Sequence, residues 1–228
     1  MNPTTGTSPL VLAVVFGMLS LLPALLLVGT SFVKCSVVLG LIRNALGSAE
    51  TPSALVVLGL SAILSLHVMA PTARAMVDRA GPQLAEALAA DPLTPDGLAR
   101  LGRAWDAAKV PWVRFLRANA HARERRLFAD LARQAAQRQG AAVATVGDDD
   151  VSVLLPAFVV TELTRAFTIG FLVFLPFLVV DLVIASLLVS LGLTALPPPQ
   201  VALPFKLLLF VAADGWLLLA RALVLGYR

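Results

Sequence analysis

Two aspartates, Asp181 and Asp214, interrupt apolar runs near the C-terminal end of the chain. Two carboxyl groups at a similar depth can share a proton and act on a bound substrate, as in aspartic proteases. The surrounding residues read VVDLV and AADGW, and neither contains the Gly-x-Gly-Asp sequence of the intramembrane proteases. The sequence also lacks a nucleotide-binding glycine loop, a metal-ligand cluster and a nucleophile arrangement. We therefore expect neither an enzyme nor a cofactor.

Charged residues beyond Val151 balance in number but not in position. Before the terminal arginine there are three acids and three bases: Glu162, Asp181, Asp214, Arg165, Lys206 and Arg221. An ionised side chain in an apolar segment needs a partner or water. Glu162 and Arg165 can pair on one helix face. Lys206 and Asp214 cannot pair, because eight helical residues place them about 80° beyond two full turns.

The segment LPPPQ, Leu196–Gln200, predicts a helical hairpin with Pro197, Pro198 and Pro199 at its tip. If the chain folds back at Pro198, Asp181 lies 17 residues before the tip and Asp214 lies 16 after it, at the same depth. Lys206 then lies opposite Ser190 and meets no acid within its hairpin. The missing partners are expected on another segment or another copy of the chain. The simpler alternative is that these side chains snorkel to the membrane surface.

The composition indicates an integral membrane protein, with 58% hydrophobic and 14% charged residues among 228. The net charge of +4 does not indicate nucleic-acid binding, because the basic residues neither cluster nor alternate with aromatics. Apolar runs at Leu10–Val33 and Ala54–Met76 are long enough to span a bilayer. The first nine residues carry no base, so we do not expect a cleaved signal peptide. The intervening loop, with Lys34 and Arg43, is expected in the cytoplasm.

The distribution of charge divides the chain into three parts: residues 1–77, a polar insertion over 78–150, and residues 151–228. In the insertion, Thr94 and Pro95 predict the start of a helix that runs to about Lys109. A second helix is expected from Pro111 to Gln139. Four aromatic residues are expected to form the apolar stripe of this element: Trp105, Trp112, Phe115 and Phe128.

The apolar run from Val151 to Ala195 is 45 residues long. As one straight helix it would measure about 67 Å, twice the thickness of the bilayer hydrocarbon. It is therefore expected to be divided or bent at Pro156, Gly170 or Pro176. The fold class is all-α, with about four hydrophobic segments in helical hairpins and a small soluble helical insertion.

Three long stretches resemble the FliP/SctR family of bacterial type III secretion export proteins. They are LPALLLVGTSFVKCSVVLGLIRNALGSAETP (Leu22–Pro52), PAFVVTELTRAFTIGFLVFLPFLVVDLVIASLL (Pro156–Leu188) and ALPFKLLLFVAADGW (Ala202–Trp216). The order and spacing of the blocks are kept, whereas residues 78–150 match only loosely. TSFVK at Thr30–Lys34 looks more like the injectisome branch, and LPPPQVALPFK is closer to flagellar members; we favour the injectisome branch.

The resemblance implies a core subunit of an export gate for unfolded protein substrates in the bacterial inner membrane. It implies a homo-oligomeric, pentameric ring that joins two companion membrane subunits, with the polar insertion on the periplasmic side. Neighbouring copies would then supply the missing charge partners, in an intersubunit network of Glu162, Arg165, Asp181, Lys206 and Asp214. Asp181 of one copy is expected to pair with Lys206 of the next.

The family also places a pore constriction at the hairpin tip, where many members carry methionines. Here the corresponding residues are Leu193, Thr194 and Ala195, so a flexible methionine seal is in doubt. Leu193, Thr194 and Leu196 are expected to form a stiffer constriction; alternatively, the leucines simply pack against neighbouring helices. The alternative function for the whole chain is a small helical channel or carrier subunit for ions or solutes.

Overall fold

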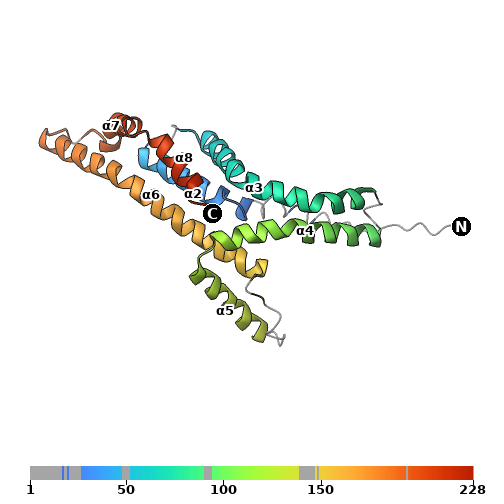
Figure 1. Ribbon diagram of the computed structural model, residues 1–228. Helices are drawn as coiled ribbons and strands as arrows, with labels where there is room; N and C mark the ends of the chain where they lie inside the picture. Colours follow the sequence, from blue (N-terminus) through green and yellow to red (C-terminus); the bar gives the residue numbers. More distant parts are fainter. Residues whose placement is uncertain are drawn as a thin grey trace. The chain divides into compact units, whose positions relative to one another are not determined.

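The computed structural model describes residues 27–47, 52–89, 94–138, 149–193 and 195–227, together with Gly17, Ser20 and Gly147. Every regular element in these ranges is a helix (Figure 1), which confirms the all-α prediction. The helices are α2 (Phe32–Leu46), α3 (Ala54–Ala89), α4 (Pro95–Asn119), α5 (Ala122–Arg138), α6 (Val151–Ser190), α7 (Pro198–Ala212) and α8 (Gly215–Leu225). Most of the first predicted apolar run, Leu10–Val33, lies outside the described residues.

The chain divides into two compact units, and α3 and α6 contribute to both. The first, which we call the polar unit, consists of Met1–Thr30 and Met69–Phe158. The second, the apolar unit, consists of Ser31–Val68 and Val159–Arg228.

The core of the apolar unit is built on one face of α2. The buried residues Cys35, Val38, Leu39 and Ile42 recur at helical spacing and pack with residues of α6, α7 and α8. The helices α2 and α6 approach closely at Gly170, where an added Cβ would lie 3.2 Å from the Cβ of Leu41. This glycine is therefore a contact point between two helices rather than a break in one.

The long apolar run forms one helix. The run was predicted to be divided or bent at Pro156, Gly170 or Pro176; helix α6 continues past all three for 40 residues, so it is not divided. It ends at Ser190, where Gly192 takes the left-handed φ of 71°. The backbone N–H of Gly192 donates to Val189 O and that of Leu193 donates to Leu188 O, the bonding pattern of a Schellman cap.

The prolines of LPPPQ begin the next helix instead of stopping the previous one. Pro197 is the N-cap of α7, and Pro198 and Pro199 occupy its first turn, where the missing N–H costs no hydrogen bond. Helices α7 and α8 meet at an angle of 61° across Ala213 and Asp214. The next residue is a glycine because a Cβ on Gly215 would lie 2.7 Å from Cζ of Phe210 and closer still to two other atoms of that ring.

Two helices among the described residues are long and apolar enough to cross a membrane: α3 over Ala54–Ala87, and α6. The bent pair α7 and α8 would make a third if it counts as one span. The sequence predicted about four hydrophobic segments, of which the first lies mostly outside the described residues. The protein is a multi-pass membrane protein.

The polar unit contains α4 and α5. The predicted cap is confirmed, because the Thr94 hydroxyl accepts a hydrogen bond from the Gly97 N–H at 3.1 Å. The predicted end at Lys109 is wrong: α4 continues through Pro111 to Asn119. The chain turns extended at Ala120, where the side-chain amide of Asn119 donates to Phe115 O.

The predicted aromatic stripe is only partly buried. Trp112 and Phe115 are buried, Phe128 is half-buried and Trp105 is 48% exposed. The Trp112 indole donates to Gly29 O at 2.8 Å, a bond that ties α4 to the segment before α2. Trp105 rests against Trp112 with ring centroids 6.4 Å apart.

Candidate functional site

A buried ionic cluster lies inside the apolar unit, and Glu162 of α6 is its centre. Its members, which we call the Glu162 cluster, are Lys34, Glu162, Arg165 and Tyr227. Glu162 Oε2 lies 3.2 Å from Lys34 Nζ, and the two side chains are 0% and 1% exposed. Glu162 Oε1 accepts from Arg165 Nη1 at 2.8 Å, which confirms the predicted local pair.

Tyr227, just beyond α8, completes the cluster. Its hydroxyl donates to Glu162 Oε2, and its ring lies under Lys34, with Nζ 3.4 Å from the ring centroid. Burial and the Glu162 carboxylate raise the pKa of the Tyr227 phenol above its ordinary value, so the phenol keeps its proton and acts as a donor. The cluster thus joins α2, α6 and the end of the chain through one carboxylate.

Sequence reasoning missed Lys34 and Tyr227 as members of this site. Lys34 was predicted to lie in a cytoplasmic loop, whereas it belongs to α2 and is buried. A carboxylate has about four acceptor sites, and a guanidinium that binds it in a bidentate way fills two of them, so a buried Glu162 has room for donors besides Arg165. The need for a further basic partner was therefore a signal, but its position in the chain was not.

A second ion pair lies near the hairpin. Lys206 Nζ of α7 is 2.7 Å from Asp181 Oδ2 of α6 and donates to Ala45 O of α2 at 3.1 Å. The prediction that Lys206 meets no acid in its own hairpin is wrong. Asp181 lies nine residues before Ser190, and Lys206 lies nine residues after Pro197, so the two residues face each other across the turn.

The error came from the position of the turn. The prediction placed the tip at Pro198, but the link between α6 and α7 covers residues 191–197, so its midpoint lies about four residues before Pro198. Moving the tip by that amount changes the pairing between α6 and α7 by about twice as many residues, which brings Lys206 level with Asp181 rather than Ser190. The other carboxylate oxygen, Asp181 Oδ1, is buried without a hydrogen-bond donor from the described residues.

Asp214 belongs to neither ion-pair group. It lies at the break between α7 and α8 with a φ of 50°, an uncommon backbone conformation for a residue with a side chain. It is exposed, and no base of the described residues forms an ion pair with it. Its backbone carbonyl accepts from the Leu218 N–H at 3.1 Å, which starts α8.

The residues predicted to form a constriction lie at the hairpin turn. Leu193 and Leu196 are 45% and 46% exposed, and Thr194 lies outside the described residues. The two leucines are joined by a hydrogen bond from Leu196 N to Leu193 O at 3.3 Å. The turn thus presents apolar side chains that this chain does not cover.

Comparison with known proteins gives one consistent result. Residues 15–223 match the model of the FliP family. The chain is 45% identical over 210 residues to the hypersensitivity response secretion protein HrcR of Ralstonia nicotianae, covering 92% of this chain and 93% of the relative. It is 41% identical over 216 residues to the Yop proteins translocation protein R of Yersinia pestis, covering 95% of each.

A flagellar protein is also similar. The flagellar biosynthetic protein FliP of Caulobacter vibrioides is 40% identical over 210 residues, which cover 92% of this chain and 73% of the relative. The match to the family model, over residues 15–223, includes α2 to α7 and all but the last residues of α8. It therefore includes the helices that carry both ion-pair groups. This chain belongs to the FliP family.

Proposed function

We propose that this chain is a core subunit of the export gate of a type III secretion system, in the bacterial inner membrane, and forms part of the channel for unfolded protein substrates. Its relatives are named as secretion, translocation and flagellar biosynthesis proteins. In this role the chain is a structural component and not an enzyme. Membership of the injectisome branch stays a prediction, because relatives from both branches match.

The observation that carries the proposal is the uncovered apolar length of α6. Exposed large apolar side chains extend from Val160 to Val189, about 44 Å along the helix axis. The hydrocarbon of a bilayer is about 30 Å thick, so lipid could cover this length only at a tilt of about 45°, beyond the usual range of about 0–40°. We therefore propose that other protein covers part of α6, as expected for a subunit of an assembly.

Contacts with other copies of the chain are part of the proposal. Of the five residues predicted to form an intersubunit network, Asp214 is exposed and forms no ion pair with the described residues. We propose that it meets a base of a neighbouring subunit. Asp181 and Lys206 already pair within one chain, through Asp181 Oδ2. In an intersubunit role, a neighbouring copy would donate a hydrogen bond to the other oxygen, Asp181 Oδ1, and the pair within the chain would stay.

The hairpin turn is proposed to form the constriction of the channel. Leu193 and Leu196 expose their side chains at a turn between two apolar helices, where a ring of copies would bring equivalent turns together. An apolar ring of this kind closes by excluding water. Replacing both leucines by glycine should raise the leakage of small solutes through the assembled gate, and unchanged leakage would remove this part of the proposal.

The assembly itself can be tested by native mass spectrometry of the chain in mild detergent, alone and co-expressed with the two companion membrane subunits that the family resemblance implies. We expect one discrete homo-oligomer that retains both companion membrane subunits. A monomer or dimer that ignores them would overturn the export-gate proposal and favour a small channel or carrier subunit. A secretion assay, with variants of the chain expressed in cells that lack the native subunit, then distinguishes loss of assembly from loss of export.

A further inference from the structure

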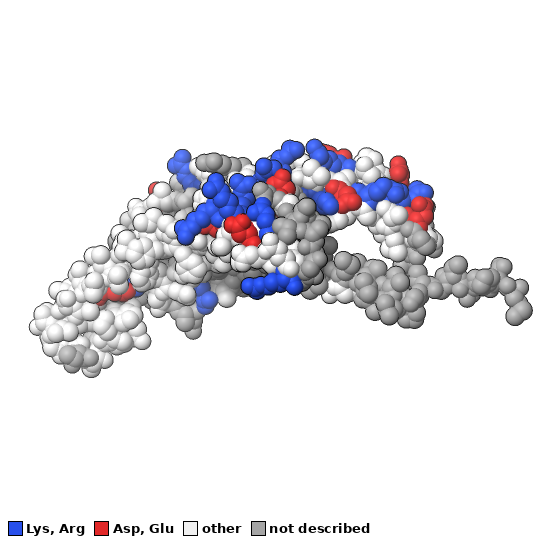
Figure 2. Space-filling view, turned by 90° about the horizontal axis from the view of Figure 1, so that it is seen from below, with Lys and Arg blue, Asp and Glu red and all other residues white. Residues whose placement is uncertain are grey.

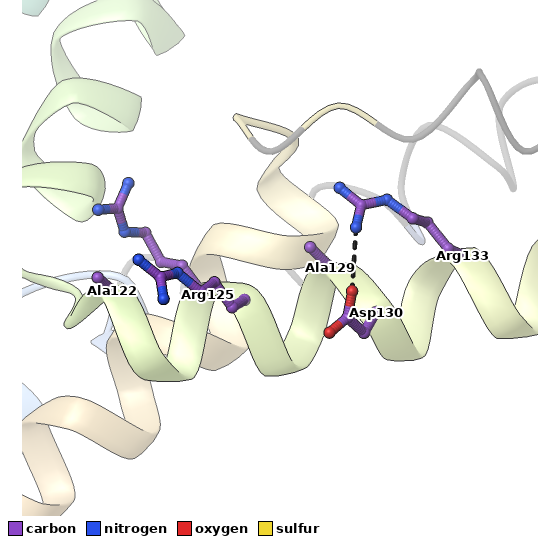
Figure 3. A pocket seen from close by; sticks show the side chains of 6 residues that line it. Ala122, Arg125, Ala129, Asp130 and Arg133 are labelled. Carbon is purple, nitrogen blue, oxygen red and sulfur yellow. Dashed lines mark hydrogen bonds and ion pairs between the residues drawn. The ribbon is translucent and has the colours of Figure 1, made fainter.

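A concavity lies along α5 in the polar unit, which contains neither of the two ion-pair groups. Its volume is about 370 Å³, and one face of the helix lines it with Ala122, Arg125, Arg126, Ala129, Asp130 and Arg133. These positions recur at intervals of three and four residues, so their side chains leave the same side of the helix (Figure 3). The two alanines leave room between the longer side chains.

The lining carries an excess of positive charge. Three arginines face one acid, and Asp130 is already engaged, because its Oδ1 accepts from Arg133 Nη1 at 3.0 Å. Figure 2 shows Lys and Arg side chains gathered over α5, with acidic side chains among them. Within the described part of the chain, neither Arg125 nor Arg126 forms an ion pair.

Arg125 also has an unmet hydrogen-bonding need. Its Nε is shielded from solvent and finds no acceptor among the described residues. A buried donor without an acceptor costs free energy that a bound anion would recover. Ala122 and Arg125 lie in the first turn of α5, where the positive end of the helix dipole adds to the attraction for an anion.

We propose that this concavity binds a phosphate group. Guanidinium groups present paired N–H donors in a planar fork that matches phosphate oxygens, and several arginines around one hollow suit a group with three or more acceptor oxygens. The phosphate can come from an anionic phospholipid headgroup or from inorganic phosphate in solution. The inference does not depend on the proposed export function, since it concerns a single chain.

The test uses the full chain in neutral detergent and phosphate-free buffer. One arm titrates inorganic phosphate by calorimetry. The other adds equimolar phosphatidylglycerol and phosphatidylcholine and measures by native mass spectrometry which lipid is retained. Saturable one-to-one phosphate binding, or retention of phosphatidylglycerol over phosphatidylcholine, would support the site and identify the source. If neither ligand binds, the proposal is overturned.

Substitutions locate the binding. Arg125→Gln combined with Arg126→Gln should weaken it about tenfold or more, the loss expected for charge-assisted hydrogen bonds. The control removes the same charge from exposed positions of the same helix that do not line the concavity, Arg123→Gln with Arg138→Gln. An equal loss in both pairs would mean diffuse attraction and refute the site. Because Arg126 is exposed, Arg126→Gln alone provides a variant that leaves folding intact.

Discussion

Replacing Glu162 by glutamine should destabilise the protein strongly, because it removes the only carboxylate of the Glu162 cluster. Lys34 is 1% exposed and would keep a buried charge with no acid beside it. Removing one partner of a buried ion pair typically costs about 3–5 kcal/mol. Because Arg165 is partly exposed, it can turn toward solvent and should add little to that loss.

Removing the other charge of the buried pair, that of Lys34, should lower the free energy of unfolding by less than Glu162→Gln does. Lys34→Met leaves Glu162 with Arg165 Nη1 at 2.8 Å and with the Tyr227 hydroxyl, so its carboxylate is still satisfied. Combining Lys34→Met with Glu162→Gln removes both buried charges. Since an apolar replacement of a buried pair is often neutral, the double variant should be more stable than Glu162→Gln alone by about 2 kcal/mol.

The assay is the free energy of unfolding in mixed detergent micelles, from a titration with dodecyl sulfate followed by loss of helical circular dichroism. Asp149→Asn is the matched control, since it breaks an exposed ion pair of similar length, 2.7 Å to Arg117. That change should cost about 1 kcal/mol or less. The reasoning is refuted if Glu162→Gln costs no more than this control, or if the two cluster substitutions simply add.

Three further substitutions test the turn, the second ion pair and the helix contact, each by the same unfolding measurement. Gly192→Ala places a Cβ at a φ of 71° and should lower the free energy of unfolding by about 1 kcal/mol. An unchanged free energy of unfolding would contradict the Schellman cap at the end of α6. Lys206→Met strands the carboxylate of Asp181 and should cost about 1–3 kcal/mol, a smaller loss than at Glu162 because Asp181 is 30% exposed. Gly170→Ala forces Leu41 to move and should cost about 1–3 kcal/mol, whereas full stability would show that α2 and α6 are not in close contact.

Some features of the fold could be read directly from local sequence. The helical class follows from long apolar runs and low charge, and the start of α4 follows from Thr94 and Pro95, because a cap uses only neighbouring residues. The pair of Glu162 and Arg165 is equally local, three residues apart on one helix. The resemblance to the FliP family rested on long matching blocks and is confirmed by the family match over residues 15–223.

The errors concern helix ends. Three prolines suggested a stop at LPPPQ, yet Gly192 ends α6 several residues earlier and the prolines open α7. Proline fits the first turn of a helix as well as it disrupts an interior, so its presence alone does not decide which end it marks. Pro111 was the opposite case: it was predicted to begin the second helix, but it lies inside α4, and α5 begins at Ala122.

By itself, the sequence determined that this is a helical membrane protein with charges that need partners in its apolar segments. Only the tertiary structure decided which partners they find. Lys34 and Tyr227 reach Glu162 from positions 128 and 65 residues away, and Lys206 meets Asp181 because the turn lies over residues 191–197. Ion pairs form between side chains that packing brings within about 4 Å, and that proximity depends on the register of whole helices rather than on any local pattern.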